Sequence, residues 1–473
     1  MARKPPAAAR ATGARGSPAG RAPDPGSGPV TSTAHTSPPT PPAAAVGTRL
    51  ALLDGFRGLA IVLVVLSHLG KVWPEQLRPD LGPLDGFFLA GSVGVTMFLV
   101  VGGYLVTRGL LAARLRDGVR GPVRSFGRRL VRISLQVYLL LGVVAVVAEL
   151  DPTDPNSRAA TNSSILAVGT YWWNDYVRLN ALDARSDLGP LYYLSIEVQF
   201  YAVLLLLVLV LARHRRVLLA LLAVAIPVVT VWRWYVYDTQ GWFAASLMTT
   251  TRMDGLLYGA LVAVAVDLLP GRIRDDPRRQ SAALVGGALL VVGGVVVSCA
   301  FYDIGAYFKV QGIALTVACA LLVLGSATPL DPRAYAVRVL SGRRLAWLGA
   351  ASLTIFVWHV PIFELLMRHT PSWSPAVRTV VALALLAGVV VLVERWVARP
   401  VGRMTGRLGP TPAGHRPDNR PRRLAVRPVS PPPMPVRGPT GTDAAVPVTA
   451  TVPRTDELDL WDDDLDWDGP VRD

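Results

Sequence analysis

The sequence contains few cysteines and almost no lysine. Its two cysteines, Cys299 and Cys319, both lie in apolar segments, so a disulfide framework or a cysteine-based metal site is not expected. Lysine occurs only at Lys4, Lys71 and Lys309, although the formal net charge is +15 at pH 7. The positive charge therefore comes almost entirely from arginine. No nucleic-acid-binding motif or folded basic domain accompanies it, so we expect no nucleic-acid partner.

The two ends of the chain lack apolar runs. Residues 1–48 are rich in Pro, Ala, Gly, Ser, Thr and Arg, without the apolar stretch of a signal peptide, so the first membrane helix is expected to direct insertion. Residues 401–473 are again rich in Pro and Arg and end in the acidic stretch "TDELDLWDDDLDWDG". We expect both ends to be disordered tails. The acidic, Trp-containing end is most simply a solvated tail, and the alternative is a docking peptide for a partner protein.

The region between the tails, residues 49–400, is rich in long apolar runs. A bilayer core of ~30 Å takes about 20 helical residues, and helices satisfy their own backbone groups in lipid. The sequence therefore predicts an all-α, polytopic transmembrane helix bundle of about ten helices. The expected spans lie near 52–70, 87–107, 133–150, 190–212, 216–232, 247–266, 281–300, 309–327, 345–369 and 376–398.

Arginine is concentrated in every second connection between these spans. The connection between the second and third spans is the richest, with Arg108, Arg114, Arg116, Arg120, Arg124, Arg128, Arg129 and Arg132. The longest of the other connections, 151–189, holds five aspartates, from Asp151 to Asp187. Because basic loops remain in the cytoplasm, the alternation predicts a multi-pass protein of the cytoplasmic membrane with both termini in the cytoplasm.

The first span carries three groups that hydrocarbon penalises. "LLDGFRGLAIVLVVLSHLG" holds Asp54, Arg57 and His68. Arg57 and His68 are eleven residues apart, which places them about 20° apart around a helix and ~16 Å apart along it. Asp54 lies one turn before Arg57 on nearly the same face. Charges inside a membrane usually face the bundle interior and mark function, so this stripe is a candidate site.

Three later spans add polar and aromatic candidates. In "YLSIEVQFY" three of them recur every four residues on one face, and in "TTTRMDGLLYGALVA" an Arg and an Asp two positions apart should each have another partner. These candidates are Tyr193, Glu197, Tyr201, Arg252, Asp254 and, in "FVWHVPIF", Trp358 and His359. Counted by depth, the ionisable groups fall in the outer half with His68. The sequence thus predicts one buried polar pocket above a cationic mouth that contains Arg57.

Six stretches together resemble the multispan acyltransferase type 3 family, which O-acylates sugars of bacterial envelope polymers and secondary metabolites. They are "LDGFRGLAIVLVVLSH", "GSVGVTMFLVVGGYLVTRGLL", "FGRRLVRI", "LSIEVQFYAV", "RMDGLLYGALVA" and "ASLTIFVWHVPI", in the order of the family and over roughly residues 50–400. The resemblance implies an essential Arg57–His68 pair, an acid at Glu197, and a basic cluster on the acyl-CoA side. That cluster is Arg128, Arg129 and Arg132. The family often has Glu at the position of Val198 and Trp at that of Tyr193.

The leading hypothesis is transfer of an acyl group, acetyl by resemblance, from cytoplasmic acyl-CoA to a hydroxyl of a sugar-containing acceptor, without a metal. His68 would be the general base, with Glu197 holding its other ring nitrogen, or a transient acyl carrier. Arg57 or Arg252 would stabilise the oxyanion. We expect substrate contacts from Asp54, Tyr193, Tyr201, Arg252, Asp254, Trp358 and His359.

Two other functions fit the composition less well. A proton-coupled transporter of a glycan or small metabolite would also bury His, Glu, Asp and Arg. Such carriers often contain internal repeats, and no second copy of "DGFRG" or "SIEVQFY" is present. A membrane scaffold that recruits partners through the acidic tail would leave the buried ionisable groups unexplained.

Overall fold

The computed structural model describes residues 43–73, 86, 88, 91–270, 276–301, 303–326 and 335–407. Contacts divide the chain into the units Met1–Thr411 and Pro412–Asp473, and every described residue belongs to the first. The acidic C-terminal stretch and most of both expected tails lie outside the described residues. Throughout the described ranges, every regular element is helical, which confirms the predicted all-α class.

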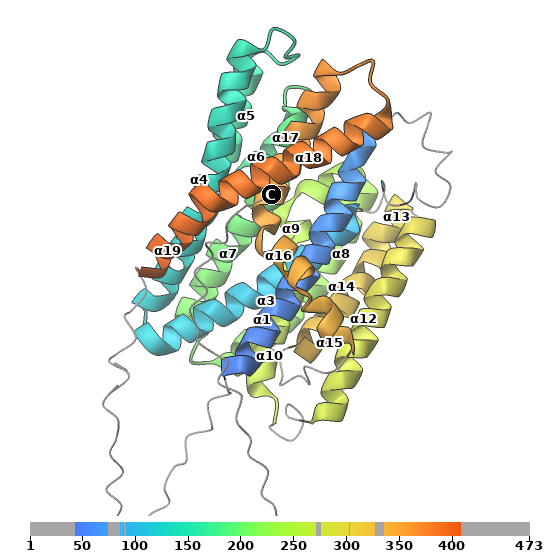
Figure 1. Ribbon diagram of the computed structural model, residues 1–473. Coiled ribbons are helices and arrows are strands. Elements are labelled where there is room, and N and C mark those ends of the chain that lie inside the picture. The colour runs from blue at the N-terminus through green and yellow to red at the C-terminus, as the bar shows by residue number, and fades with distance from the viewer. Residues whose placement is uncertain are drawn as a thin grey trace, which may run out of the picture. The chain divides into compact units, whose positions relative to one another are not determined.

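The helices follow the predicted apolar runs closely (Figure 1). In chain order they are α1 (Ala43–His68), η1 (Leu69–Lys71), α3 (Gly91–Asp117), α4 (Arg120–Leu150), α5 (Arg158–Gly169), α6 (Trp173–Leu179), η4 (Ser186–Leu191), α7 (Tyr192–Leu211), α8 (Arg215–Leu247), α9 (Thr249–Arg252), α10 (Asp254–Leu268), α12 (Pro277–Ala300), α13 (Ile304–Ala306), η5 (Tyr307–Gln311), α14 (Gly312–Ser326), α15 (Tyr335–Leu340), α16 (Arg343–Ala350), α17 (Ser352–His369), α18 (Pro375–Val393), η6 (Glu394–Ala398) and α19 (Arg399–Arg407). Helix α1 begins inside the expected N-terminal tail, and α19 extends into the expected C-terminal tail.

The number of membrane crossings is close to the expected ten. Eight helices of the described part are long and apolar enough to cross a membrane, and the count is nine if the pair α16 and α17, bent by 69° at Ala351, is taken as one span. The remaining expected span, 247–266, is instead divided at Met253 into α9 and α10. Since α10 has 15 residues, it spans only about 22 Å. The protein is therefore a multispan membrane protein, and ten is an approximate count.

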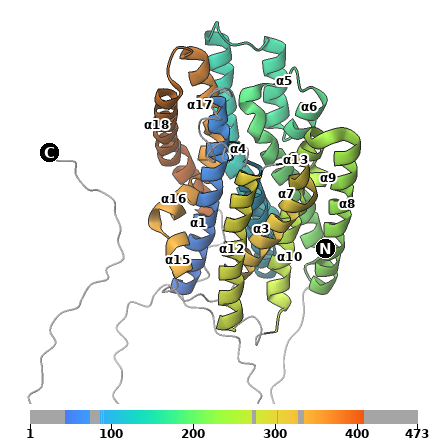
Figure 2. The ribbon, with the colours of Figure 1, turned by 90° about the vertical axis from the view of Figure 1, so that its right-hand side faces the viewer.

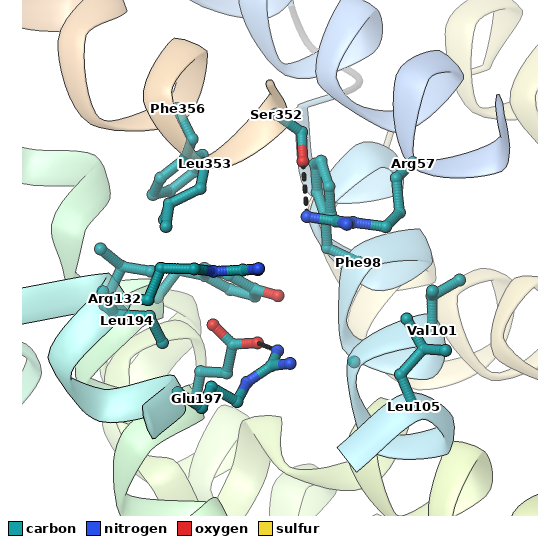
Figure 3. Close-up of a pocket in the computed structure, with 14 residues that line it drawn as sticks. Arg57, Phe98, Val101, Leu105, Arg132, Leu194, Glu197, Ser352, Leu353 and Phe356 are labelled. Atoms are coloured by element: carbon teal, nitrogen blue, oxygen red, sulfur yellow. Dashed lines mark hydrogen bonds and ion pairs between the residues drawn. The ribbon is translucent and has the colours of Figure 1, made fainter. Parts of the chain in front are cut away.

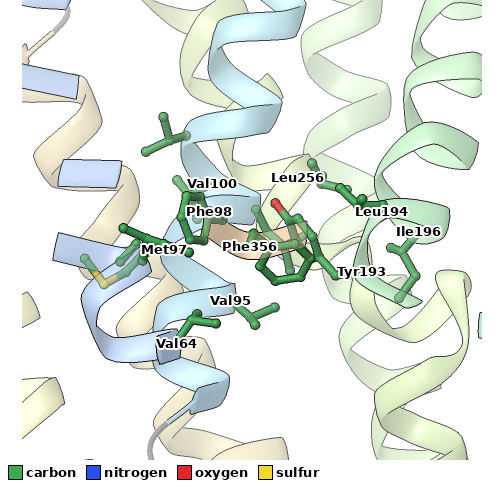
Figure 4. Close-up of a cluster of buried hydrophobic side chains, with 14 of the residues drawn as sticks. Val64, Val95, Met97, Phe98, Val100, Tyr193, Leu194, Ile196, Leu256 and Phe356 are labelled. Atoms are coloured by element: carbon green, nitrogen blue, oxygen red, sulfur yellow. The ribbon is translucent and has the colours of Figure 1, made fainter. Parts of the chain in front are cut away.

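Helix α3 lies at the centre of the bundle and contacts α1, α4, α7, α10 and α14. Two-thirds (67%) of its most apolar stretch is buried, against 22% for α8 and for α12. Helix α8 lies at one edge of the bundle in Figure 2, and α12 lies at the right-hand side in Figure 1. The outward side chains of these edge helices are mainly Val, Leu and Trp, as lipid contact requires. The buried core joins α1, α3, α7, α10 and α17, as Figure 4 shows for side chains such as Val64, Phe98 and Phe356.

Glycine permits the closest packing in this core, between α3 and α10. A Cβ on Gly103 would lie 2.2 Å from the carbonyl oxygen of Leu256, and one on Gly259 would lie 2.0 Å from that of Val100. Any side chain at either position would push the two backbones apart. Small residues are the usual means by which membrane helices approach one another, because apolar contact with lipid gives no preference for helix association.

Helices α1 and α17 run past each other and place the candidate residues in successive contacts. Arg57 of α1 reaches Ser352, the first residue of α17, and further along the same two helices His68 meets His359. Beyond His68, Lys71 of η1 pairs with Glu364 of α17. The bend at Ala351 makes this arrangement possible, because it places the N-terminus of α17 beside Arg57 in the bundle interior.

Candidate active site

A pocket of about 620 Å³ lies between α1, α3, α4, α7 and the start of α17, and we call it the arginine pocket. Its polar lining consists of Arg57, Arg129, Arg132, Glu197 and Ser352, together with the Tyr193 side chain. In Figure 3, Arg57 and Arg132 point into the pocket from opposite walls, with Glu197 on a third side. The remaining lining is apolar, so the pocket combines concentrated positive charge with a hydrophobic interior.

Arg57 is held by one partner on its own helix and one on α17. Its Nη1 lies 3.3 Å from Asp54 Oδ1, as the spacing of the two residues predicts, and its Nη2 donates to Ser352 Oγ at 2.8 Å. Two directed contacts fix the plane of the guanidinium group and leave it facing the pocket. Asp54 itself is not among the lining residues, so it orients Arg57 rather than entering the pocket.

Glu197 is bound by groups from α4 and α7. Arg129 Nη2 donates to Glu197 Oε1 at 3.1 Å and to the Tyr201 hydroxyl at 2.8 Å, and that hydroxyl also donates to Glu197. The Arg129 guanidinium further lies 4.6 Å from the centre of the Tyr201 ring. The shared face of Glu197 and Tyr201 is thus confirmed. The expected bond from Glu197 to His68 is not present, because Arg129 and Tyr201 occupy this carboxylate.

Arg132 is the cation of the pocket without a direct partner. It is exposed and makes no hydrogen bond or ion pair with any residue the structure describes. Helix α17 adds to this excess, since it begins at Ser352 without a side-chain cap, and a helix N-terminus carries a partial positive charge. Arg128, expected to act with Arg129 and Arg132, does not line the pocket; its Nη1 is buried without a hydrogen-bond partner in the described part.

Three aromatic rings close the end of the arginine pocket nearest the histidines, and we call Phe98, Tyr193 and Phe356 the aromatic wall. The Tyr193 ring centre lies 6.4 Å from that of Phe98 and 5.4 Å from that of Phe356. All three rings line the pocket. Phe356 also lies 5.8 Å from the ring of His359, so it stands between the charged pocket and the histidines.

His68 and His359 form an edge-to-face pair with ring centres 4.8 Å apart, here called the histidine pair. Nδ1 of His68 lies 2.8 Å from the Val64 carbonyl oxygen, and Nδ1 of His359 lies 2.8 Å from that of Phe356. A carbonyl oxygen can only accept, so each Nδ1 carries the proton and each neutral ring presents an unprotonated Nε2. His359 is fully buried, and its Nε2 has no hydrogen-bond partner in the described chain. His68 is only partly buried.

Arg252 and Asp254 do not join the histidines, contrary to the single pocket expected from depth. Asp254 forms a buried ion pair with Arg233 of α8, and Arg252 lies 5.8 Å from the ring centre of Phe308. The expectation that these two residues have separate partners is confirmed. Arg233 was missed because it follows the end of the expected span 216–232 and no local spacing links it to Asp254.

Trp358 is buried between the helices and lies outside both the arginine pocket and the histidine pair. Its indole Nε1 has no hydrogen-bond partner in the described part of the chain. Within the same ranges, no group of three His, Cys, Asp or Glu side chains could hold a metal ion. The geometry therefore assigns the polar chemistry of the bundle to two places: the arginine pocket and the histidine pair.

Comparison with known families gives the chain its class. The model of the acyltransferase domain family, the type 3 acyltransferases, matches residues 50–395. The chain belongs to this family. The matched segment contains the arginine pocket, the aromatic wall and the histidine pair. The acyltransferase domain of this chain is thus the membrane bundle itself, and transfer of acyl groups is the chemistry of its family.

Three similar proteins come from Gram-positive bacteria. The chain is 26% identical over 327 residues to the peptidoglycan O-acetyltransferase OatA of Listeria monocytogenes. This alignment covers 66% of this chain and 49% of that protein. It is 26% identical over 324 residues to the putative peptidoglycan O-acetyltransferase YrhL of Bacillus subtilis (66% and 48%), and 25% identical over 323 residues to a putative O-acetyltransferase of Staphylococcus aureus strain COL (66% and 50%). The chain therefore spans about half the length of these curated relatives. No solved structure gives a significant match.

Proposed function

We propose that this acyltransferase domain moves an acyl group, acetyl by analogy with the similar O-acetyltransferases, from acyl-CoA to a hydroxyl of a sugar-containing acceptor. The observation that carries the proposal is the arginine pocket, with its spare cation Arg132, on the opposite side of the aromatic wall from two histidines that present free nitrogens. A transporter would need no such separation between a site for an anion and a site for a base.

The donor would enter at the end of the bundle that contains the arginine-rich connection. Phosphate groups bind guanidinium groups through paired, charge-assisted hydrogen bonds, and a helix N-terminus also favours an anion. Arg132, Arg57 and the start of α17 offer these features together. Basic connections stay on the cytoplasmic side, so the pocket would face the cytoplasm, where acyl-CoA is found, and both termini would be cytoplasmic.

The thin pantetheine arm would cross the aromatic wall and bring the thioester to His68. There Nε2 of His68 would take the proton of the acceptor hydroxyl as its oxygen attacks the thioester carbonyl. The new C–O bond forms, the C–S bond breaks, and the same proton passes from His68 to the departing CoA sulfur. In the alternative, Nε2 attacks the thioester first and His68 carries the acyl group. Neutral imidazole with a free Nε2 suits either course.

The proposal is tested with labelled acetyl-CoA and membranes that contain either the unaltered chain or the His68→Ala variant at equal abundance. We expect label to enter the glycan fraction only with the unaltered chain. Longer acyl-CoA donors are run in parallel, because the acyl group is assigned by analogy. If no donor labels any lipid or glycan fraction, with native envelope material supplied, the proposed reaction is refuted. Incorporation that persists without His68 would instead refute its assigned role.

A further inference from the structure

A second polar cavity lies beyond the histidine pair, on the side opposite the aromatic wall, and we call it the mixed-charge groove. It has a volume of about 840 Å³. Its charged lining is Lys71, Arg185, Asp187, Glu364 and Arg368, and Ser186 lies beside them. These residues come from η1, from α17, and from η4 with the residue before it, which are distant in the sequence. Neither the comparisons nor the chemistry described above gives this groove a task.

The groove begins close to the histidines. Lys71 follows His68 by three residues and Glu364 follows His359 by five, which corresponds to about one to one and a half helical turns, or roughly 5–8 Å. The Lys71–Glu364 pair therefore joins the same two segments one step further out. A molecule bound in the groove would therefore lie about one helical turn from His68, which is only partly buried.

Each of the three cations in the groove is paired with a carboxylate, unlike Arg132 in the arginine pocket. Glu364 binds Lys71 and accepts a hydrogen bond from Ser186 Oγ at 2.6 Å. Asp187 accepts from both Nε and Nη2 of Arg185, at 3.0 and 2.8 Å. A site whose cations are all paired with carboxylates offers many donors and acceptors but no unpaired cation. Such a set matches an uncharged molecule with several hydroxyls better than it matches a phosphate.

Arg368 completes the donor set. Its Nη1 forms ion pairs with Asp151 Oδ2 at 3.3 Å and Asp154 Oδ2 at 3.4 Å, and this buried nitrogen makes no hydrogen bond within the described chain. Met367 and Pro155 supply apolar surface between the polar groups. A sugar ring needs this combination, because its hydroxyls lie around the edge and its C–H groups form an apolar face.

We propose that the mixed-charge groove binds the sugar unit of the acceptor, as an uncharged, hydroxyl-rich ring, and directs one hydroxyl toward His68. Glu364 accepts from a hydroxyl of the ring, and Lys71 donates to a neighbouring one. This inference rests on the proposed function. It deepens that function by giving the acceptor its own binding site, separated from the donor site by the histidine pair and the aromatic wall.

The test uses the full chain in liposomes, labelled acetyl-CoA, and solubilised envelope glycan from the producing cells as the acceptor probe. Glu364→Gln keeps the shape of the side chain but removes its charge. We expect the apparent KM for glycan to rise roughly tenfold, as for one lost hydrogen bond to a charged group, with kcat and the KM for acetyl-CoA within twofold of the unaltered chain. A glycolipid extract from the same cells is run beside the soluble glycan, to show whether the sugar arrives as polymer or linked to lipid.

Glu149→Gln is the matched control, because Glu149 pairs with Arg158 outside the groove and more than half of its side chain is exposed. The exchange variant Lys71→Glu with Glu364→Lys separates binding from bracing. It restores an ion pair with inverted charges. If the pair only held η1 against α17, the exchange variant would therefore regain the apparent KM for glycan of the unaltered chain. We expect no recovery.

Three results would overturn the inference. These are a Glu364→Gln variant that behaves like Glu149→Gln, a loss confined to kcat or to the KM for acetyl-CoA, and recovery in the exchange variant. If the unaltered chain transfers no label to either acceptor preparation, the proposed function itself fails, and the groove assignment falls with it.

Discussion

The arginine pocket and the histidine pair both include residues of α1 and α17, but their polar groups are bonded in opposite ways. In the pocket, Arg57 and Arg129 are fixed by partners from other helices or other turns, and Arg132 is left as spare charge. At the pair, Nδ1 of each histidine bonds a backbone carbonyl of its own helix, the Ser67 hydroxyl lies 3.2 Å from that of His68, and Nε2 is left free of described partners. The first arrangement is suited to holding an anion, and the second to accepting a proton.

The largest effect should come from the histidine pair. His68→Gln removes the proposed base while preserving size and polarity, and we expect kcat to fall by about 10²–10⁴, the usual contribution of general acid–base catalysis. The affinity for acetyl-CoA, measured by equilibrium binding to the purified chain, should stay unchanged, because the arginine pocket is untouched. A variant that loses donor binding together with kcat would show that the two regions are not functionally separate.

The complementary change is Arg132→Gln in the arginine pocket. We expect the KM for acetyl-CoA to rise about 10- to 100-fold with little change in kcat, since a charge-assisted bond to phosphate is lost. Arg128→Gln is the control, because Arg128 is four residues away on α4 but does not line the pocket. The measurement is steady-state kinetics on both variants, which gives kcat and the KM for acetyl-CoA. Equal effects at the two positions would contradict a pocket-specific role for Arg132.

His359 tests whether the pair works as a pair. His359→Leu fills the buried space with an apolar side chain and removes the unpaired Nε2 of the ring packed against His68. We expect kcat to fall about tenfold, because His68 loses the polar ring packed against it. The KM for acetyl-CoA should not change. Thermal unfolding of the variant should match that of the unaltered chain. Full activity in His359→Leu would reduce His359 to a packing residue.

The smallest effect on catalysis should come from the ion-pair network beside the groove. Burial would raise the pKa of the Asp154 carboxyl, but hydrogen bonds from Asn156 and Arg185 outweigh it and lower the pKa to about 2. Its unfolded value is about 3.9, so Asp154 contributes about 2 kcal/mol above pH ~4, and this is lost as the pH falls toward 2. Asp154→Asn should lower the unfolding temperature by a few degrees at pH 7, and the difference should shrink between pH 4 and pH 2.5.

The matching control for that measurement is Asp183→Asn, an exposed residue of the same connection. It should leave the unfolding temperature unchanged at every pH. The kcat of Asp154→Asn at pH 7 should remain within twofold of the unaltered value, because the network touches neither the arginine pocket nor the histidine pair. A difference in unfolding temperature that persists at pH 2.5 would show that Asp154 acts through packing rather than through its charge.

Residue spacing in the sequence correctly predicted the contacts between side chains of the same helix. The pairing of Asp54 with Arg57 and the common face of Glu197 and Tyr201 follow from positions three and four residues apart. Depth counting also brought His68 and His359 to one level, and their rings are in contact. Because each helix is long, apolar and nearly continuous, the positions of most spans could be read from hydropathy.

Contacts between helices could not be predicted in the same way. Depth placed Glu197 with His68, but the rotation of α7 turns its carboxylate toward Arg129 on α4. Depth alone cannot supply that rotation, which depends on how α3, α4 and α7 pack. Arg233 and Ser352 were missed for the same reason, since each meets its partner across a helix boundary. Lys71 and Glu364 are separated by almost three hundred residues, and no local pattern links them.

The aromatic wall also bears on the electrical insulation of the membrane. A water-filled passage from the arginine pocket to the mixed-charge groove would let ions flow down the membrane potential, which is worth about 2.3 kcal/mol per charge at 100 mV. Phe98, Tyr193 and Phe356 interrupt that path with rings in contact or near contact. The proposed transfer would therefore bring a neutral acyl group past the wall without opening a path for ions across the membrane.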